Sequence, residues 1–68
     1  MPYDITFQYE SQRYLPRAEK RRLRADFEAT LQRLGIRNDF PTENEAQAAL
    51  DVVREHYTEM PLEVSEFH

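Results

Sequence analysis

The chain has no cysteine in its 68 residues, and this combination limits what it can fold into more than any other feature. A domain of this size buries only roughly 60% of its unfolded surface. Chains below about 70–80 residues therefore commonly need disulfides, metals or self-association. Without cysteine, disulfides, thiol catalysis and thiolate metal sites are excluded. We expect a single domain over residues 1–68 that forms a homodimer or depends on a partner.

The composition is typical of a globular protein. Apolar residues make up 40% and charged residues 32% of the chain, which is not the balance of a disordered segment. No apolar run approaches the ~18–20 residues that cross a bilayer. Residues 1–4 lack the basic and apolar regions of a secretory signal. We expect a cytoplasmic protein that does not contact membranes.

Charge is distributed unevenly along the chain. Residues 12–37 carry eight basic and three acidic side chains, giving +5, whereas residues 38–68 carry one basic and eight acidic, giving −7. Asp4 and Glu10 supply the remaining −2 of the net charge of −4. Such a chain either neutralises itself internally or presents two faces of opposite sign.

Residue periodicity predicts a strand and then a helix in the first half. Residues 3–9 alternate between apolar and polar side chains, with Tyr9 at the end of the apolar side, which is typical of a strand with one buried face. Residues 10–14 form a polar passage or extend that strand. A helix is predicted from Pro16 to Leu34. Gly35 suits the left-handed residue that ends a helix, with Ile36 folding back on the last turn.

The second half predicts another helix and a closing strand. Thr42 and Glu45 have the spacing of a capping box, and Pro61 is expected to end the helix. Residues 62–65 alternate again, which indicates a short strand. The fold class is therefore α+β, in the order strand, helix, helix, strand, with two antiparallel-packed helices against a small sheet. A two-stranded sheet is weak alone, so we expect edge pairing between two copies to complete it.

The residues that commonly carry catalysis or bind metals are few. His56 and His68 are the only histidines, and Ser11 and Ser65 are the only serines, so no nucleophile with its base is indicated. His56 and Glu59 are three residues apart, but a zinc site needs three or four ligands. A chain with one glycine has no phosphate-binding loop. We predict no catalytic residue, no metal site and no cofactor.

A basic stripe is the sharpest candidate site. Arg17, Lys20, Arg21 and Arg24 are spaced along one flank of the first predicted helix, and Arg13 lies just upstream. Positive charges near a helix N-terminus oppose the helix dipole, and an acidic partner would relieve that cost. The partner could be another protein or the acidic half of a second copy.

Two alternatives for the basic stripe stay open. It can be a solvated helix face, partly neutralised by pairs such as Arg24–Glu28 and Arg22–Asp26, each contributing only ~0.2–0.5 kcal/mol. It can also contact nucleic acid, which we consider the least favoured partner.

An acidic face is predicted on the outer side of the second helix, where it could engage a basic groove on another protein. It comprises Asp51, Glu55 and Glu59.

The order strand, helix, glycine, helix resembles that of the ribbon–helix–helix proteins. Residues 23–36, LRADFEATLQRLGI, resemble their first helix and its glycine stop, and the stretch ending at residues 60–64 is similar to their second helix and exit. The resemblance implies an antitoxin or a DNA-binding transcriptional regulator. In that geometry a strand enters the major groove. Asp4 on the strand and Glu43 at the second helix would repel phosphate, so the resemblance favours toxin binding over DNA binding.

These observations favour a small non-catalytic protein-interaction module. We expect it to bind and modulate a larger protein, with inhibition as the main effect. Small, acidic, charge-polarised chains without cysteine suit accessory proteins of phages or mobile elements. The ribbon–helix–helix antitoxin or regulator is the alternative.

Overall fold

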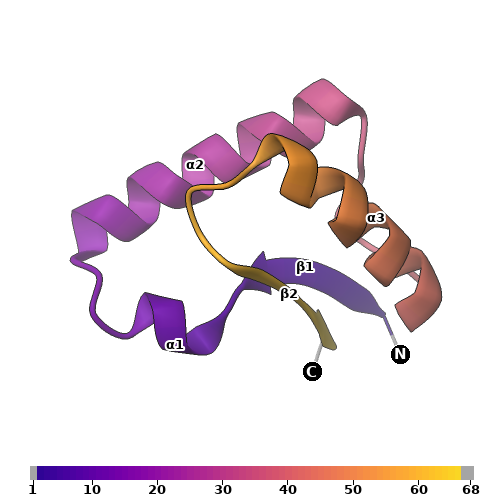
Figure 1. The fold of residues 1–68 in the computed structure, drawn as a ribbon, viewed down its shortest axis with the longest axis horizontal. Coiled ribbons are helices and arrows are strands. Elements are labelled where there is room, and N and C mark those ends of the chain that lie inside the picture. The colour runs from indigo at the N-terminus through magenta and orange to yellow at the C-terminus, as the bar shows by residue number, and fades with distance from the viewer. Residues whose placement is uncertain (1, 67–68) are drawn as a thin grey trace.

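A computed structural model describes residues 2–66 of the chain. The elements follow in the order β1 (Tyr3–Phe7), α1 (Tyr9–Gln12), α2 (Arg17–Leu34), α3 (Glu43–His56) and β2 (Leu62–Glu66). The predicted α+β class is confirmed, because β1 and β2 form a two-stranded antiparallel sheet that packs against the helices. α2 and α3 lie over one face of it and cross at a wide angle, with the C-terminal end of α3 close to α2 (Figure 1). No helix within residues 2–66 is long and apolar enough to cross a membrane.

β1 is shorter than its alternating pattern predicts. Ile5 and Phe7 are buried in the core, but Tyr9 is 73% exposed, so the prediction that Tyr9 continues the buried side was wrong. The chain leaves the sheet after Phe7 and turns into α1. The side chain of Gln12 stabilises this turn, because its Nε2 donates to the Phe7 carbonyl at 2.9 Å.

α2 confirms the first predicted helix and its end. Gly35 has a φ of 70°, in the left-handed region. The Gly35 amide donates to the Gln32 carbonyl at 3.1 Å, and the Ile36 amide donates to the Leu31 carbonyl at 2.9 Å. These are the two hydrogen bonds of the Schellman motif, so the only glycine in the chain ends this helix.

α3 begins where the sequence predicts and ends earlier. The Thr42 hydroxyl accepts from the Glu45 amide at 3.3 Å, which confirms the N-cap. The prediction that the helix continues to Pro61 was wrong, because Tyr57 is already extended at φ −131° and ψ 106°. Leaving the helix at Tyr57 lets the chain cross back to the sheet, where Leu62 lies opposite Phe7.

Three aromatic rings join the sheet to both long helices. The ring centroids of Phe7 and Phe27 are 5.6 Å apart, those of Phe27 and Tyr57 are 5.5 Å apart, and those of Phe7 and Tyr57 are 6.0 Å apart. The Tyr57 hydroxyl donates to the Leu23 carbonyl of α2 at 3.0 Å. The rings and this buried hydrogen bond thereby link β1, α2 and the end of α3.

The outer edge of β1 is closed by the connection between α2 and α3. Tyr3 and Phe40 exchange two backbone hydrogen bonds, of 2.8 and 2.9 Å. The side chain of Asn38 accepts from the Ile5 amide at 2.7 Å and donates to the Ile5 carbonyl at 2.9 Å. The Asn38 amide thereby takes the place of a neighbouring strand's backbone. Within residues 2–66, the open strand edge belongs to β2.

Candidate functional site

The basic stripe lies on one flank of α2, as its spacing predicts. Arg17, Arg21 and Arg24 are exposed, and Lys20 is partly exposed. Arg13 follows directly on α1 and is exposed as well. In the fold, α1 and the first turns of α2 face each other across a short connection (Figure 1). Arg13 and Lys20 line one hollow with Tyr9, so the five basic side chains belong to one continuous surface.

Two tyrosines adjoin this basic surface, and the sequence reasoning missed them. The side chains of Tyr9 and Tyr14 are 73% and 84% exposed, and the guanidinium carbon of Arg13 lies 5.6 Å from the centroid of the Tyr14 ring. The polar run from Glu10 to Arg13 was the available signal, because it breaks the alternation that would have buried both rings. We call the combined area the basic–aromatic surface: Tyr9, Arg13, Tyr14, Arg17, Lys20, Arg21 and Arg24.

The five basic residues of this surface form no ion pair within residues 2–66, where all three ion pairs belong to Arg22. The predicted Arg24–Glu28 pair is not formed. Arg24 instead lies near Asp4 of β1, and both line a small cavity beside the sheet. Burial raises the pKa of the Asp4 carboxyl, and the positive charge of Arg24 offsets only part of that rise. Within residues 2–66, the charges of the stripe are therefore not neutralised by ion pairs.

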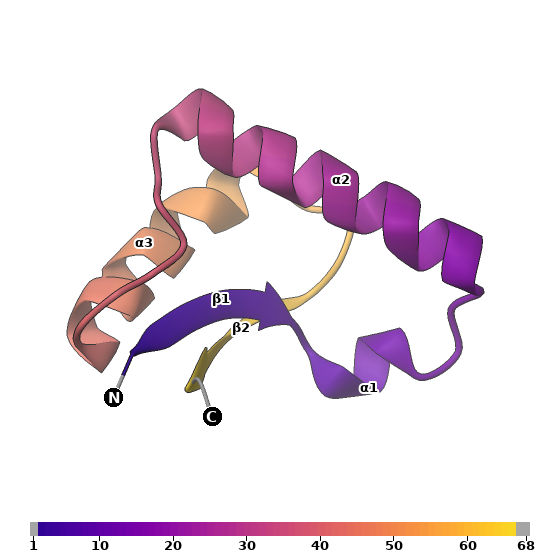
Figure 2. The ribbon, with the colours of Figure 1, turned by 180° about the vertical axis from the view of Figure 1, so that it is seen from behind.

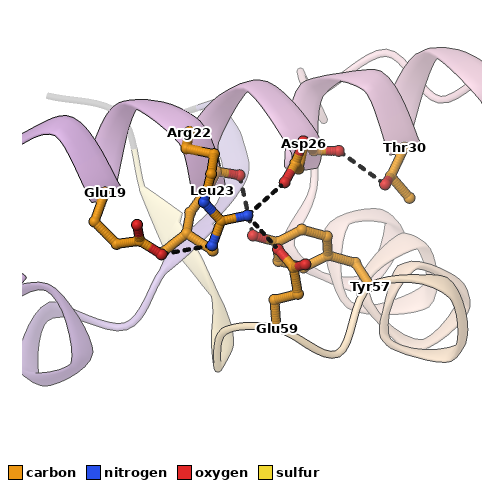
Figure 3. Close-up of polar contacts among 7 residues, drawn as sticks. All are labelled: Glu19, Arg22, Leu23, Asp26, Thr30, Tyr57 and Glu59. Atoms are coloured by element: carbon orange, nitrogen blue, oxygen red, sulfur yellow. Dashed lines mark hydrogen bonds and ion pairs between the residues drawn. The ribbon is translucent and has the colours of Figure 1, made fainter.

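Arg22 shows the opposite situation on the other flank of α2. Its guanidinium contacts the carboxylates of Glu19, Asp26 (3.1 Å) and Glu59 (3.8 Å), as Figure 3 shows. The hydrogen bond from Arg22 lowers the pKa of the Glu19 carboxyl. The Arg22–Asp26 pair was predicted and is confirmed. Internal charge pairing is thus concentrated on one arginine that does not belong to the basic stripe.

The predicted acidic face is only partly assembled. Asp51 and Glu55 are exposed one turn apart on α3, where the sequence places them. Glu59 lies beyond the end of α3, since the helix stops at His56, and its carboxylate turns back toward Arg22. The structure therefore brings two of these three carboxylates together on the outer side of the helix.

Among residues 2–66, no set of metal ligands gathers around His56. It is exposed at the last position of α3 and lines a shallow hollow with residues of α2 and Glu59. Across the described part of the chain, no group of three His, Cys, Asp or Glu side chains gathers as metal ligands would. His68, the other histidine, lies outside the described residues.

The strand geometry differs from what the ribbon–helix–helix resemblance implies. A DNA-reading ribbon is made of two strands that enter the major groove, and a ribbon of two β1 strands would need a free β1 edge. One edge of β1 pairs with β2, and the other pairs with Asn38 and Phe40. The outward side chain of Asp4 would also carry negative charge into the groove.

Comparisons with known proteins add no family to this description. No protein-family model matches the chain, and neither curated proteins nor solved structures give a significant match. The functional inference accordingly depends on the side chains of the chain itself.

Proposed function

We propose that the protein is a non-catalytic interaction module whose basic–aromatic surface binds an acidic surface on a larger protein. The observation that carries the proposal is one of position: within residues 2–66, five basic residues without an ion pair gather on one flank of α2 and the adjoining end of α1, whereas Arg22 on the other flank contacts three carboxylates. Arginine and tyrosine are the residue types enriched at the centres of protein interfaces. Exposed arginines beside Tyr9 and Tyr14 provide that combination.

Binding would modulate the larger protein, with inhibition by occlusion of the acidic surface as the main effect. The setting we propose is that of an accessory protein of a phage or mobile element, in the cytoplasm. Such a protein needs only a contact surface to act on its target.

The distribution of charge favours a protein partner over nucleic acid. The positive residues occupy one flank of α2 and the end of α1, whereas α3 exposes carboxylates at Glu43, Glu45, Asp51 and Glu55. The chain carries a net charge of −4. A long polyanion would extend beyond the basic area and meet these carboxylates, and nucleic-acid affinity depends largely on phosphate contacts. A confined acidic patch on a protein does not incur that repulsion.

A double charge reversal, Arg17→Glu with Arg21→Glu, tests the proposal. Each reversal changes the charge by −2, so the variant has a net charge of −8 instead of −4. Both residues are exposed in the first turns of α2, where glutamate suits the helix dipole, so the fold should be retained. In quantitative affinity capture from the source cells, we expect the natural chain to retain a partner protein. The variant should retain at least about tenfold less of that protein.

The matched control is Arg33→Glu with Arg37→Glu, which gives the same net charge of −8 at exposed positions outside the basic–aromatic surface. The control should retain the captured protein. Equal loss in both variants would show only a dependence on net charge and would contradict the proposal. Retention of duplex DNA by the natural chain, falling steeply between ~50 and ~200 mM salt, would favour nucleic acid instead.

A further inference from the structure

The hydrogen-bonding groups of β2 alternate between its two edges, and their direction follows from β1. Residues directly opposite in an antiparallel pair exchange both backbone hydrogen bonds or neither. Ile5 directs its N–H and C=O to Asn38 on the far edge of β1, so Val64, which lies opposite Ile5, directs its own groups away from β1. The same alternation turns the backbone groups of Leu62 and Glu66 outward.

These outward groups lack strong partners. Within residues 2–66, no hydrogen bond involves the N–H or C=O of Val64 on this edge. The Leu62 carbonyl receives only a long contact from Nη2 of Arg54, at 3.4 Å. No helix lies beyond β2 on the side away from β1 in either view of the ribbon (Figures 1 and 2). β2 therefore presents a short open edge that can accept another strand.

The outward groups are symmetric about Val64. An antiparallel second copy of β2, related by a twofold axis through Val64, places Val64 opposite itself and Leu62 opposite Glu66. All three residues with outward groups then find backbone partners in a single register. An axis through Glu63 would instead place two Glu63 carboxylates directly opposite each other, and like charges in that arrangement are destabilising.

Charge supports the same register. Arg54 reaches the outer edge at the Leu62 end of β2, whereas Glu66 is exposed at the other end of the strand. Reversing the direction of the second strand brings Glu66 of the second copy opposite Leu62 and next to Arg54. The twofold axis creates this ion pair twice. Arg54 and Glu66 of one copy cannot pair with each other, because the Arg54 guanidinium reaches the Leu62 end of β2 and Glu66 is at the other end.

We propose that two copies of the chain pair through β2, antiparallel and about a twofold axis at Val64, to form a four-stranded sheet with ion pairs between Arg54 and Glu66 of the second copy. The interface does not depend on the proposed function. The proposed contact uses a strand of only 5 residues and is therefore small. Interfaces that bury under about 1,200 Å² are typical of weak association, so the dimer should dissociate on dilution. Arg24 of the basic–aromatic surface lines a cavity beside β1, on the side of the sheet away from the open β2 edge.

Single cysteine substitutions test this register, because the chain has no cysteine of its own. Only Val64 meets itself across the axis, at about 5.5 Å between Cα atoms, which suits a disulfide. Under mild oxidation we expect Val64→Cys to form covalent dimers faster than Glu63→Cys or Ser65→Cys. Fastest cross-linking at either neighbour, or no advantage over Asn44→Cys on the exposed side of α3, would overturn the proposal.

A charge exchange tests the ion pair in folded protein. Arg54→Glu and Glu66→Arg should each weaken dimerisation about tenfold in sedimentation experiments, since each places like charges together twice. The double variant should recover the natural affinity, because it restores the pair with its signs exchanged. Additive weakening in the double variant would overturn the proposal. So would a natural chain that stays monomeric up to ~1 mM.

Discussion

At the scale of single residues, Tyr57 does most to join the elements. Its ring contacts Phe7 and Phe27, and its hydroxyl bonds to the Leu23 carbonyl inside the core. Burial, with the nearby carboxylates of Glu59 and Asp26, raises the pKa of the Tyr57 phenol to about 12, from an ordinary value of 10.0. The folded state therefore holds this phenol in its protonated form.

Replacing Tyr57 with phenylalanine removes the hydrogen bond and this ionisation. We expect Tyr57→Phe to lower the free energy of unfolding by about 1 kcal/mol at neutral pH. The pKa is raised on folding, so the contribution of the phenol is fully present below pH 10 and is lost as the pH rises from 10 toward 12. Denaturant titrations should show the gap between the two proteins narrowing over that range. If the difference in the free energy of unfolding between the two proteins stayed constant from pH 10 to 12, the raised pKa of Tyr57 would be contradicted.

Substituting an exposed tyrosine should change partner affinity without changing the stability of the fold. Tyr14 is 84% exposed, so Tyr14→Ala should change the free energy of unfolding by less than about 0.5 kcal/mol. Partner affinity should fall roughly tenfold, because an exposed tyrosine beside arginines is a typical interface anchor. Val52 is 45% exposed on α3, away from the basic–aromatic surface, and Val52→Ala is the control. Equal effects of Tyr14→Ala and Val52→Ala on partner affinity would show that Tyr14 does not contribute to binding.

At the scale of elements, the residues 37–41 act as a substitute strand. The side chain of Asn38 supplies both hydrogen bonds that a neighbouring backbone would give to Ile5, and Phe40 pairs with Tyr3. This closes the β1 edge and leaves the edge of β2 as the open one within residues 2–66. Because this connection covers the edge of β1, β2 is the strand that can pair with a second copy.

Substitution of Asn38 measures how strongly this edge is held. Asn38→Ala should lower the free energy of unfolding by about 1–3 kcal/mol, since two backbone groups of β1 lose their partner. Asn44→Ala, on the exposed side of α3, should change it by less than about 0.5 kcal/mol. Chemical denaturation compares the two. A similar small effect at both asparagines would mean that the Asn38 hydrogen bonds do not stabilise the sheet.

Local patterns predicted most of these elements, and long-range contacts account for the rest. The alternation in β1, the glycine stop of α2 and the Thr42 cap are local signals, and all three are confirmed. The early end of α3 coincides with a contact from Tyr57 to Leu23 on another helix, and sequence spacing carries no record of that contact. The role of Asn38 depends on Ile5, 33 residues away.

The candidate site follows the same division. The helical spacing of the stripe from Arg17 to Arg24 was enough to place it on one flank of α2. The contribution of Tyr9 was missed, because the strand periodicity of residues 3–9 gave that residue a buried position, although the polar run after it was a signal against this. The separation of Glu59 from Asp51 also escaped prediction, since it follows from where α3 ends.

At the scale of the whole molecule, opposite charges are separated more than they are paired. Positive side chains gather over α1 and α2, while exposed carboxylates lie along α3. Ion pairing within residues 2–66 uses Arg22 alone among the basic residues. Exposed ion pairs contribute little to stability, so the separation carries little cost for folding. What it provides is a molecule with a positive surface over α1 and α2, which we propose as the binding surface.

The most direct measurement is calorimetric titration of the captured partner into the natural chain, the Arg17→Glu/Arg21→Glu variant and the Arg33→Glu/Arg37→Glu control. We expect at least about tenfold weaker binding for the first variant and natural affinity for the control. We also expect the affinity of the natural chain to fall as salt rises from ~50 to ~200 mM. Unchanged affinity of the first variant, or turnover of a substrate by the natural chain, would contradict the proposed binding function.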